Sequence, residues 1–185
     1  MLWGTAVIIG LTVLVTTLQY LVAGVLPAFQ RDLDALVAGE WWRLVSPLFV
    51  QPHGWGQCLF NGLFLIVFVP LSERLYGAGV WLIYFGSGIV GQLANYSWRP
   101  EGGGASTAAF GAMGSLLLWV LWQRRSMPIQ YQVFASLGIG GAVVMSLIHD
   151  GHGPGLLAGA LIASILIARS KGSNQSPTTV FTKQG

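Results

Sequence analysis

Ser106 is the residue in the chain whose type and position most clearly suggest chemistry. It follows the glycine run 102–104 and opens a stretch of small apolar residues. Glycine permits a tight turn before the serine, and the apolar stretch is typical of a helix buried in lipid. Two interpretations share this geometry. The hydroxyl could cap the helix by accepting a backbone N–H, as most serines at such positions do. Alternatively, Ser106 could be a nucleophile, because a helix N-terminus offers free N–H groups and a positive dipole end to an oxyanion.

Three further polar residues supply the partners that a nucleophilic serine needs. His152 lies at the start of another apolar stretch, and imidazole is the usual general base for a serine hydroxyl. Gln57 and Asn61 lie four residues apart, so a helix presents both amides on one face. The two amides predict either hydrogen bonds between helices or donation to a developing negative charge.

Other interpretations of the neighbouring polar residues are weaker. A metal site at His149-Asp150-Gly151-His152 would lack a further ligand nearby. Asp150 is only two residues from His152, so we expect it to be an exposed aspartate at a helix start rather than the third member of a triad. His53 lies in a polar loop, and we expect a surface residue there rather than a catalyst.

The composition indicates a membrane protein. Of the 185 residues, 54% are hydrophobic and only 8% are charged, which is too little charge to cover a soluble domain of this size. The 26 glycines fit a bundle whose helices approach closely within lipid. The basic residues are scattered rather than striped along a face, which disfavours nucleic-acid binding. The single cysteine, Cys58, has no disulfide partner in the chain, and we expect it to be a small buried apolar residue.

The chain is predicted to be all-α, a polytopic membrane protein with six transmembrane helices in one domain, residues 1–169. The predicted spans are approximately 4–26, 57–75, 79–95, 106–123, 128–147 and 153–168. The first is expected to be a retained span rather than a cleaved signal peptide, because it is too long and has no basic residues before it. We expect residues 28–56 to form a partly helical loop at the membrane interface, and residues 170–185 to form a disordered cytoplasmic tail.

Basic residues orient the predicted spans. One side would carry Arg74, Arg124, Arg125, Arg169, Lys171 and Lys183, and the other only Arg31, Arg43 and Arg99. The positive-inside rule therefore predicts that both termini are cytoplasmic. The second, fourth and sixth spans would then all begin at the outer face. Asn61, Ser106 and His152 are predicted to meet near that surface, although they are far apart in the chain.

Small residues predict how the fourth and sixth spans approach each other. Gly111 lies in a stripe of small residues on the fourth span, together with Ala108 and Ser115. Gly155 and Gly159 form a GxxxG pattern that begins three residues after His152. Such stripes let helix backbones come close enough for a side chain of one helix to reach the other.

Together these motifs resemble the rhomboid family of intramembrane serine proteases over nearly the whole chain. Four segments carry the resemblance, in the order in which the family has them. They are Glu40-Trp41-Trp42-Arg43 for its aromatic-Arg motif, Gln57 with Asn61 for its HxxxN segment, Gly104-Ala105-Ser106-Thr107 for its GxSG motif, and His152 through Gly159 for its AHxxGxxxG segment.

The resemblance implies proteolysis within the membrane by a Ser106–His152 dyad. The backbone N–H of Ser106 and the amides of Asn61 and Gln57 would hold the oxyanion, and Phe110 would pack against the histidine ring. The partners implied are the lipid bilayer and transmembrane protein substrates with a single span, cleaved near the outer face. Neither a cofactor, a metal nor a nucleic acid is implied, and the expected location is a bacterial inner (cell) membrane.

Three residues depart from the family pattern. Gln57 replaces a histidine, Gly151 replaces an alanine, and Thr107 replaces the glycine after the nucleophile, where it would add bulk between the fourth and sixth spans. We expect the change at Gly151 to be harmless, whereas Gln57 and Thr107 leave open an alternative, a catalytically impaired relative that binds transmembrane helices. An unrelated six-helix transporter or scaffold is a third hypothesis, but the predicted spans contain essentially no charged residues for a midplane pathway.

Overall fold

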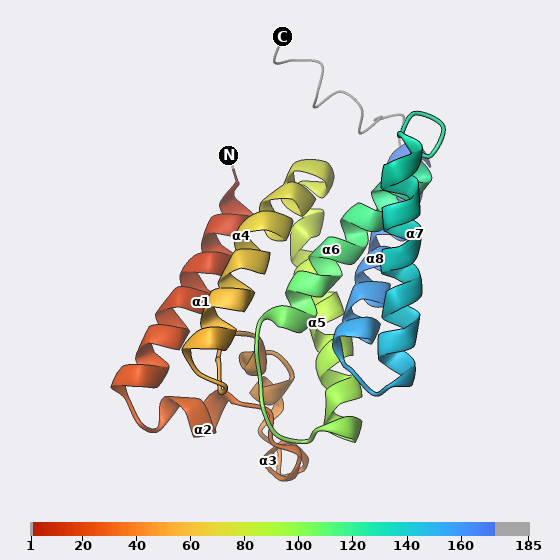
Figure 1. The fold of residues 1–185 in the computed structure, drawn as a ribbon. Coiled ribbons are helices and arrows are strands. Elements are labelled where there is room, and N and C mark those ends of the chain that lie inside the picture. The colour runs from red at the N-terminus through yellow and green to blue at the C-terminus, as the bar shows by residue number, and fades with distance from the viewer. Residues whose placement is uncertain (1, 173–185) are drawn as a thin grey trace.

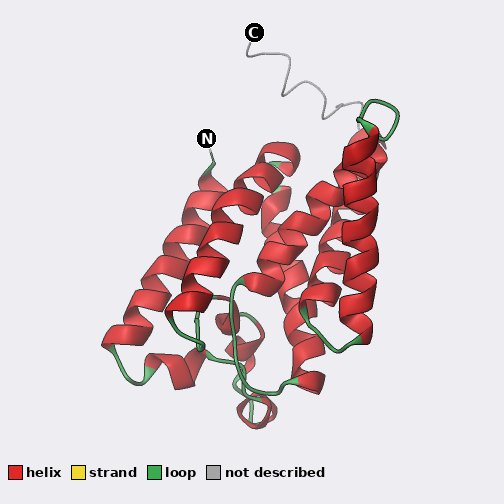
Figure 2. Ribbon diagram, in the orientation of Figure 1, coloured by secondary structure: helices red, strands yellow, loops and turns green. Residues whose placement is uncertain are grey.

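The structure is a computed structural model that describes residues 2–172, and every regular element in that part of the chain is a helix (Figure 1; Figure 2). The all-α prediction is therefore confirmed for the described residues. The six long helices are α1 (Trp3–Leu21), α4 (Trp55–Tyr76), α5 (Gly79–Trp98), α6 (Ser106–Trp122), α7 (Ile129–Leu147) and α8 (His152–Gly172). Four short helices lie between α1 and α4, namely α2 (Val25–Phe29), α3 (Leu33–Val37) and the 3₁₀ helices η1 (Trp41–Leu44) and η2 (Ser46–Leu48).

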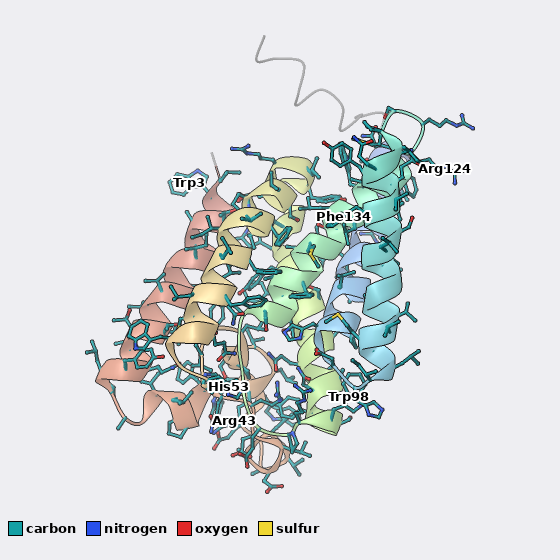
Figure 3. All side chains as sticks on the ribbon, viewed as in Figure 1. Trp3, Arg43, His53, Trp98, Arg124 and Phe134 are labelled. Carbon is teal, nitrogen blue, oxygen red and sulfur yellow. The ribbon has the colours of Figure 1, made fainter. Side chains whose placement is uncertain are left out.

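The long helices alternate in direction, so α4, α6 and α8 all begin at one end of the bundle (Figure 1). Residues 22–54 gather at this end, which we call the loop end. Figure 1 also shows α6 beginning part-way along the bundle, with residues 99–105 rising to it from the end of α5. Figure 3 labels residues at both ends: Arg43, His53 and Trp98 at the loop end, and Trp3 and Arg124 at the opposite end.

Four described helices are long and apolar enough to cross a membrane: α1, α4, α7 and residues 152–170 of α8. Helix α6 is apolar but only 17 residues long. Helix α5 buries polar side chains within the bundle, including Ser87, Gln92 and Asn95. Helices α5 and α6 pack against each other and against α8, so much of their surface is covered by protein rather than lipid.

The helix boundaries differ from the predicted spans mainly at the first and last. Helix α1 ends at Leu21 rather than at residue 26, because Val22 is extended and the chain turns before α2. Pro27 lies inside α2. Helix α8 continues to Gly172, beyond the predicted end at residue 168. The predicted tail falls mostly on residues 173–185, which lie outside the described part of the chain.

Glycines allow direct backbone contact between α6 and α8. A Cβ built at Gly159 would lie 2.0 Å from the carbonyl oxygen of Gly111, and one at Gly155 would lie 2.6 Å from that of Thr107. A Cβ at Gly114 would lie 2.1 Å from the carbonyl oxygen of Leu156. Real Cβ atoms do not come so close to backbone, so each position requires glycine at this helix spacing. The contact brings the start of α8 against the start of α6.

Buried hydrogen bonds of Arg43 fix the loop between α1 and α4. Its guanidinium donates to the carbonyl oxygens of Pro27 (2.9 Å) and Gln30 (2.7 Å), and it pairs with Glu40 at 2.6 Å. The hydroxyl of Tyr96 in α5 donates to the Arg43 carbonyl oxygen at 2.8 Å. Arg43 is 5% exposed, so its charge acts inside the protein and ties the loop to the bundle.

Glu73 caps the first turn of α1 from the last turns of α4. Its two carboxylate oxygens accept the backbone N–H groups of Gly4 (2.8 Å) and Thr5 (2.7 Å). A negative charge at a helix N-terminus satisfies unpaired N–H groups and complements the helix dipole. We expect Glu73→Gln to lower the free energy of unfolding by about 1–2 kcal/mol, measured by thermal unfolding in detergent. Glu101→Gln, which changes an exposed carboxylate, should have little effect, and equal shifts would contradict the prediction.

Candidate active site

Ser106 is the first residue of α6, and its hydroxyl does not cap the helix. The N-cap residue is Ala105, and no side chain accepts the first N–H groups of α6. The turn before it passes through Gly104, whose φ of +140° favours glycine and whose N–H donates to the Pro47 carbonyl oxygen at 2.7 Å. The capping interpretation of Ser106 is therefore wrong. Its side chain is 9% exposed, and it faces the start of α8.

His152 is the first residue of α8 and meets Ser106 directly. The Nε2 atom of His152 lies 2.8 Å from the Oγ atom of Ser106, although the two residues are 46 positions apart in the chain. The ring centroid of Phe110, one turn along α6, lies 4.7 Å from that of His152. The ring of Phe64 in α4 stacks on that of Phe110, with centroids 5.3 Å apart. These rings limit how far the imidazole can rotate away from the serine.

Asp150 contacts His152, contrary to the expectation that it is an exposed residue at a helix start. One carboxylate oxygen lies 2.5 Å from His152 Nδ1 and accepts the His152 backbone N–H at 3.0 Å. Partial burial alone would raise the pKa of Asp150, but the hydrogen bonds and positive charge of His152, together with Arg99, bring it below its ordinary value. Asp150 is thus ionised at neutral pH. Sequence spacing missed this contact because the turn before α8 is not helical.

The amides of Gln57 and Asn61 approach the turn that leads to Ser106. A Cβ built at Gly104 would lie 2.4 Å from Gln57 Nε2 and 3.1 Å from Asn61 Nδ2. Gln57 Nε2 donates to the Gly103 carbonyl oxygen at 2.8 Å, and its Oε1 accepts the His53 N–H at 2.9 Å. Each primary amide has two N–H groups. Both side chains therefore keep a second N–H beside the glycine turn.

A chain of amides that the sequence did not reveal holds Asn61. Asn61 Nδ2 donates to Gln51 Oε1 at 2.6 Å. The backbone of Gln51 is held in turn by Gln19 of α1, which donates to its carbonyl oxygen at 2.9 Å and accepts its N–H at 2.7 Å. Asn61 and Gln51 are each 1% exposed, and Gln19 is 9% exposed. A lone glutamine within an apolar span was the available signal, because a buried amide requires a partner.

Arg31 holds the other side of the glycine turn, a role that no pattern in the sequence indicated. Its guanidinium donates to the carbonyl oxygens of Arg99 (2.8 Å) and Glu101 (2.9 Å) and to the Gln92 side chain. Its backbone pairs with Gly102 in an isolated bridge. Arg31 is 5% exposed, and burial lowers the pKa of Arg31 to about 10, so the side chain remains charged at neutral pH. It fixes the segment that leads into Ser106.

Arg31→Lys is expected to loosen that segment. A lysine ammonium is a compact charge and cannot reach three acceptors in the fork geometry of a guanidinium. We expect a loss of about 2 kcal/mol in the free energy of unfolding, measured by thermal unfolding in detergent. Arg99→Lys is the matched control, because Arg99 is exposed. Equal melting temperatures for the two variants would contradict a role of Arg31 in holding residues 99–102.

The sequence around this site is similar to that of known proteins. A family model described as Rhomboid domain matches residues 38–169, which is more than half of the chain and includes Asn61, Ser106 and His152. The chain belongs to the rhomboid family. Membership confirms the family that the motifs resemble, and it fits a membrane protein with several apolar helices.

Named relatives agree with the family model. This rhomboid is 36% identical over 149 residues to Rhomboid protease GluP of Bacillus subtilis (strain 168), a match that covers 76% of the chain and 29% of GluP. It is 32% identical over 142 residues to Putative rhomboid protease YdcA of the same organism, covering 72% of the chain and 71% of YdcA. RHOMBOID-like protein 9, chloroplastic, of Arabidopsis thaliana is 34% identical over 88 residues, covering 46% of the chain and 20% of that protein. The chain thus spans less than a third of GluP.

Thr107 of this rhomboid does not separate α6 from α8, contrary to the expectation from the sequence. Its side chain faces α5, where a Cβ built at Gly91 would lie 2.7 Å from the Thr107 Cβ. The α8 backbone meets the Thr107 carbonyl at Gly155 instead. The side chain therefore fits because α5 has a glycine opposite it. A Cβ at Gly151 would lie 2.2 Å from the Asn95 amide, so the flexible end of the Asn95 side chain would have to shift to admit an alanine there.

The remaining polar candidates lie apart from the serine. His53 is exposed at the loop end (Figure 3). His149 packs against Trp98, with ring centroids 5.2 Å apart, and in the described part of the chain no three potential metal-binding side chains gather. Cys58 is half-buried rather than buried, because it lies on the α4 face toward Tyr20, with the sulfur 3.7 Å from the phenol oxygen.

Proposed function

We propose that this rhomboid is an intramembrane serine endopeptidase that acts through Ser106 and His152. The observation that carries the proposal is the 2.8 Å contact between Ser106 Oγ and His152 Nε2 at the start of a buried helix. A serine activated by an imidazole beside free backbone N–H groups is the arrangement that acyl transfer requires. The relatives GluP and YdcA, named as a rhomboid protease and a putative one, support the same reaction.

In the proposed reaction, Ser106 Oγ attacks the scissile carbonyl carbon while His152 Nε2 removes the hydroxyl proton. The carbonyl oxygen becomes an oxyanion, which accepts the backbone N–H of Ser106 and the second N–H groups of Asn61 and Gln57. The C–N bond then breaks as His152 returns the proton to the leaving amine. Water attacks the resulting ester with His152 again as base, which releases the second product and restores Ser106.

We further propose that all six long helices cross the bilayer, with both termini cytoplasmic and the loop end outward. Helices α5 and α6 are shielded by neighbouring helices, so they need less apolar surface than the four helices that are long and apolar enough to cross a membrane. Arg31 and Arg43 at the loop end are buried in hydrogen bonds, so they contribute little to the charge of that face. Arg74 and Arg124 at the opposite end are exposed and favour the cytoplasm.

The proposed substrates are membrane proteins with a single span that unwinds near the loop end, in a bacterial cell membrane. Ser106 lies at the start of α6, part-way along the bundle (Figure 1), so a scissile bond must reach that depth in extended form. A helical peptide bond is shielded by its own hydrogen bonds and side chains. Spans with helix-destabilising residues near their outer end are therefore the expected class.

Cleavage of reporter helices by the protein in lipid vesicles tests this function. Reporters should carry one span, either with a Gly-Pro pair near the outer end or with leucines there, and mass spectrometry should locate the cut. We expect cleavage of the first reporter within its outer third and little cleavage of the second. Binding of both reporters without any product would instead support the catalytically impaired relative. Absence of both binding and cleavage across the panel would contradict the proposal.

A further inference from the structure

The turn before α8 places a carboxylate against the atom of His152 that faces away from Ser106. Asp150 Oδ1 lies 2.5 Å from His152 Nδ1, while His152 Nε2 lies 2.8 Å from Ser106 Oγ. We propose that Asp150 is a positioning residue that converts the serine–histidine pair of this rhomboid into a Ser-His-Asp triad. This inference rests on the proposed function, because it concerns the same reaction.

The backbone conformation around Asp150 allows its side chain to reach the ring of His152, only two residues further along the chain. His149 adopts the left-handed region, with φ of 62°, which turns the chain sharply after α7. The Asp150 N–H donates to the Met145 carbonyl oxygen at 2.9 Å, and the Asp150 carbonyl oxygen accepts the Gly153 N–H at 3.1 Å. The carboxylate also accepts the His152 backbone N–H at 3.0 Å. Both ends of Asp150 are thus fixed, and the carboxylate is directed at the adjacent imidazole edge.

The chemical consequence concerns the proton on Nδ1. A carboxylate at Nδ1 favours the tautomer that carries its proton there, which leaves the Nε2 lone pair free to take the Ser106 proton. When His152 becomes an imidazolium, the negative charge of Asp150 stabilises it, and the carboxylate itself stays ionised. The same contact resists rotation of the ring away from Ser106.

The surroundings limit the size of the effect. The side chains of His152 and Asp150 are 29% and 26% exposed, so water screens their attraction more than in a fully buried triad. Among the described residues, Arg99 at the end of α5 is the other charged group that acts on Asp150. From α6, His152 faces Ser106 and Phe110, neither of which is charged at neutral pH, and His149 is turned toward Trp98.

Asp150→Asn tests the proposal, because asparagine keeps the size and the acceptor oxygen but removes the charge. We expect kcat for reporter cleavage in vesicles to fall by about tenfold with little change in KM, less than the 10⁴-fold effect known for a buried triad aspartate. The acid limb of the pH–rate profile should move to lower pH, since the imidazolium loses its neighbouring charge. Asp34→Asn, an exposed aspartate of α3, is the matched control and should change neither quantity.

A measurement that does not need catalysis separates this inference from the proposed function. Histidine labelled with ¹⁵N reports which ring nitrogen carries the proton, and the chain has only three histidines to assign. We expect His152 to hold its proton on Nδ1 in the native protein and to lose that preference in Asp150→Asn. Unchanged tautomer populations and an unchanged acid limb would show that Asp150 only caps α8, even if the native protein cleaves. Absence of cleavage by the native protein, with the Nδ1 preference present, would overturn the function alone.

Discussion

Replacement of Ser106 by alanine is expected to abolish reporter cleavage and labelling by a fluorophosphonate probe. The probe forms a covalent bond only with a serine whose hydroxyl is activated by a base, and Ser106 Oγ has such a base 2.8 Å away. Removal of a catalytic serine leaves only the residual acceleration that comes from binding and oxyanion stabilisation, so activity should fall by at least about 10³-fold. Initial rates in vesicles and in-gel fluorescence of the labelled protein measure the two effects.

A second serine of the same helix provides the control for this prediction. Ser115 is buried two turns further along α6, where its hydroxyl contacts the Ser72 hydroxyl at 3.0 Å and donates to the Ala112 carbonyl oxygen at 2.7 Å. Ser115→Ala should therefore label and cleave like the native protein, after correction for any change in the amount of folded protein. Equal labelling of native protein and Ser106→Ala would remove Ser106 as the nucleophile.

Asn61→Ala is expected to lower kcat by about 10²-fold or more, with little change in KM. The amide would donate to charge that exists only in the transition state, and loss of one oxyanion donor typically has an effect of this size. Asn61 is held for this role by Gln51, whose side chain accepts one of its N–H groups at 2.6 Å. Steady-state kinetics with a reporter helix in vesicles measure the effect, and thermal unfolding in detergent checks that the variant is folded.

Gln57→Ala provides the comparison for Asn61. Gln57 already donates to the Gly103 carbonyl oxygen and is only half-buried, so we expect a smaller loss of kcat, about tenfold. If Gln57→Ala were as damaging as Asn61→Ala, the two amides would share the oxyanion equally. A loss that appeared in KM rather than kcat for Asn61→Ala would contradict its role in the transition state and indicate substrate binding instead.

The sequence by itself determined the helices and the family. Apolar runs of about 20 residues must hydrogen-bond internally in lipid, so the positions of the long helices follow from composition, with errors only at ends such as Leu21 and Gly172. The alternation of helix direction also predicted that Asn61, Ser106 and His152 lie toward one end, because the second, fourth and sixth spans all begin on the same side of the membrane. The motif order around these residues identified the rhomboid family.

Tertiary structure alone decided which further polar groups contact the predicted serine, histidine and asparagine. The contact of Asp150 with His152 depends on a left-handed residue at His149, and residue spacing along an ideal helix does not anticipate such a turn. Arg31 and Gln19 reach the site from segments far from it in the chain, so no local pattern could assign their partners. The pattern of apolar residues is a local property of each helix, and it indicates only which residues are buried. Hydrogen bonds between helices depend on the distance and rotation of both partners, and those are set only when the whole bundle packs.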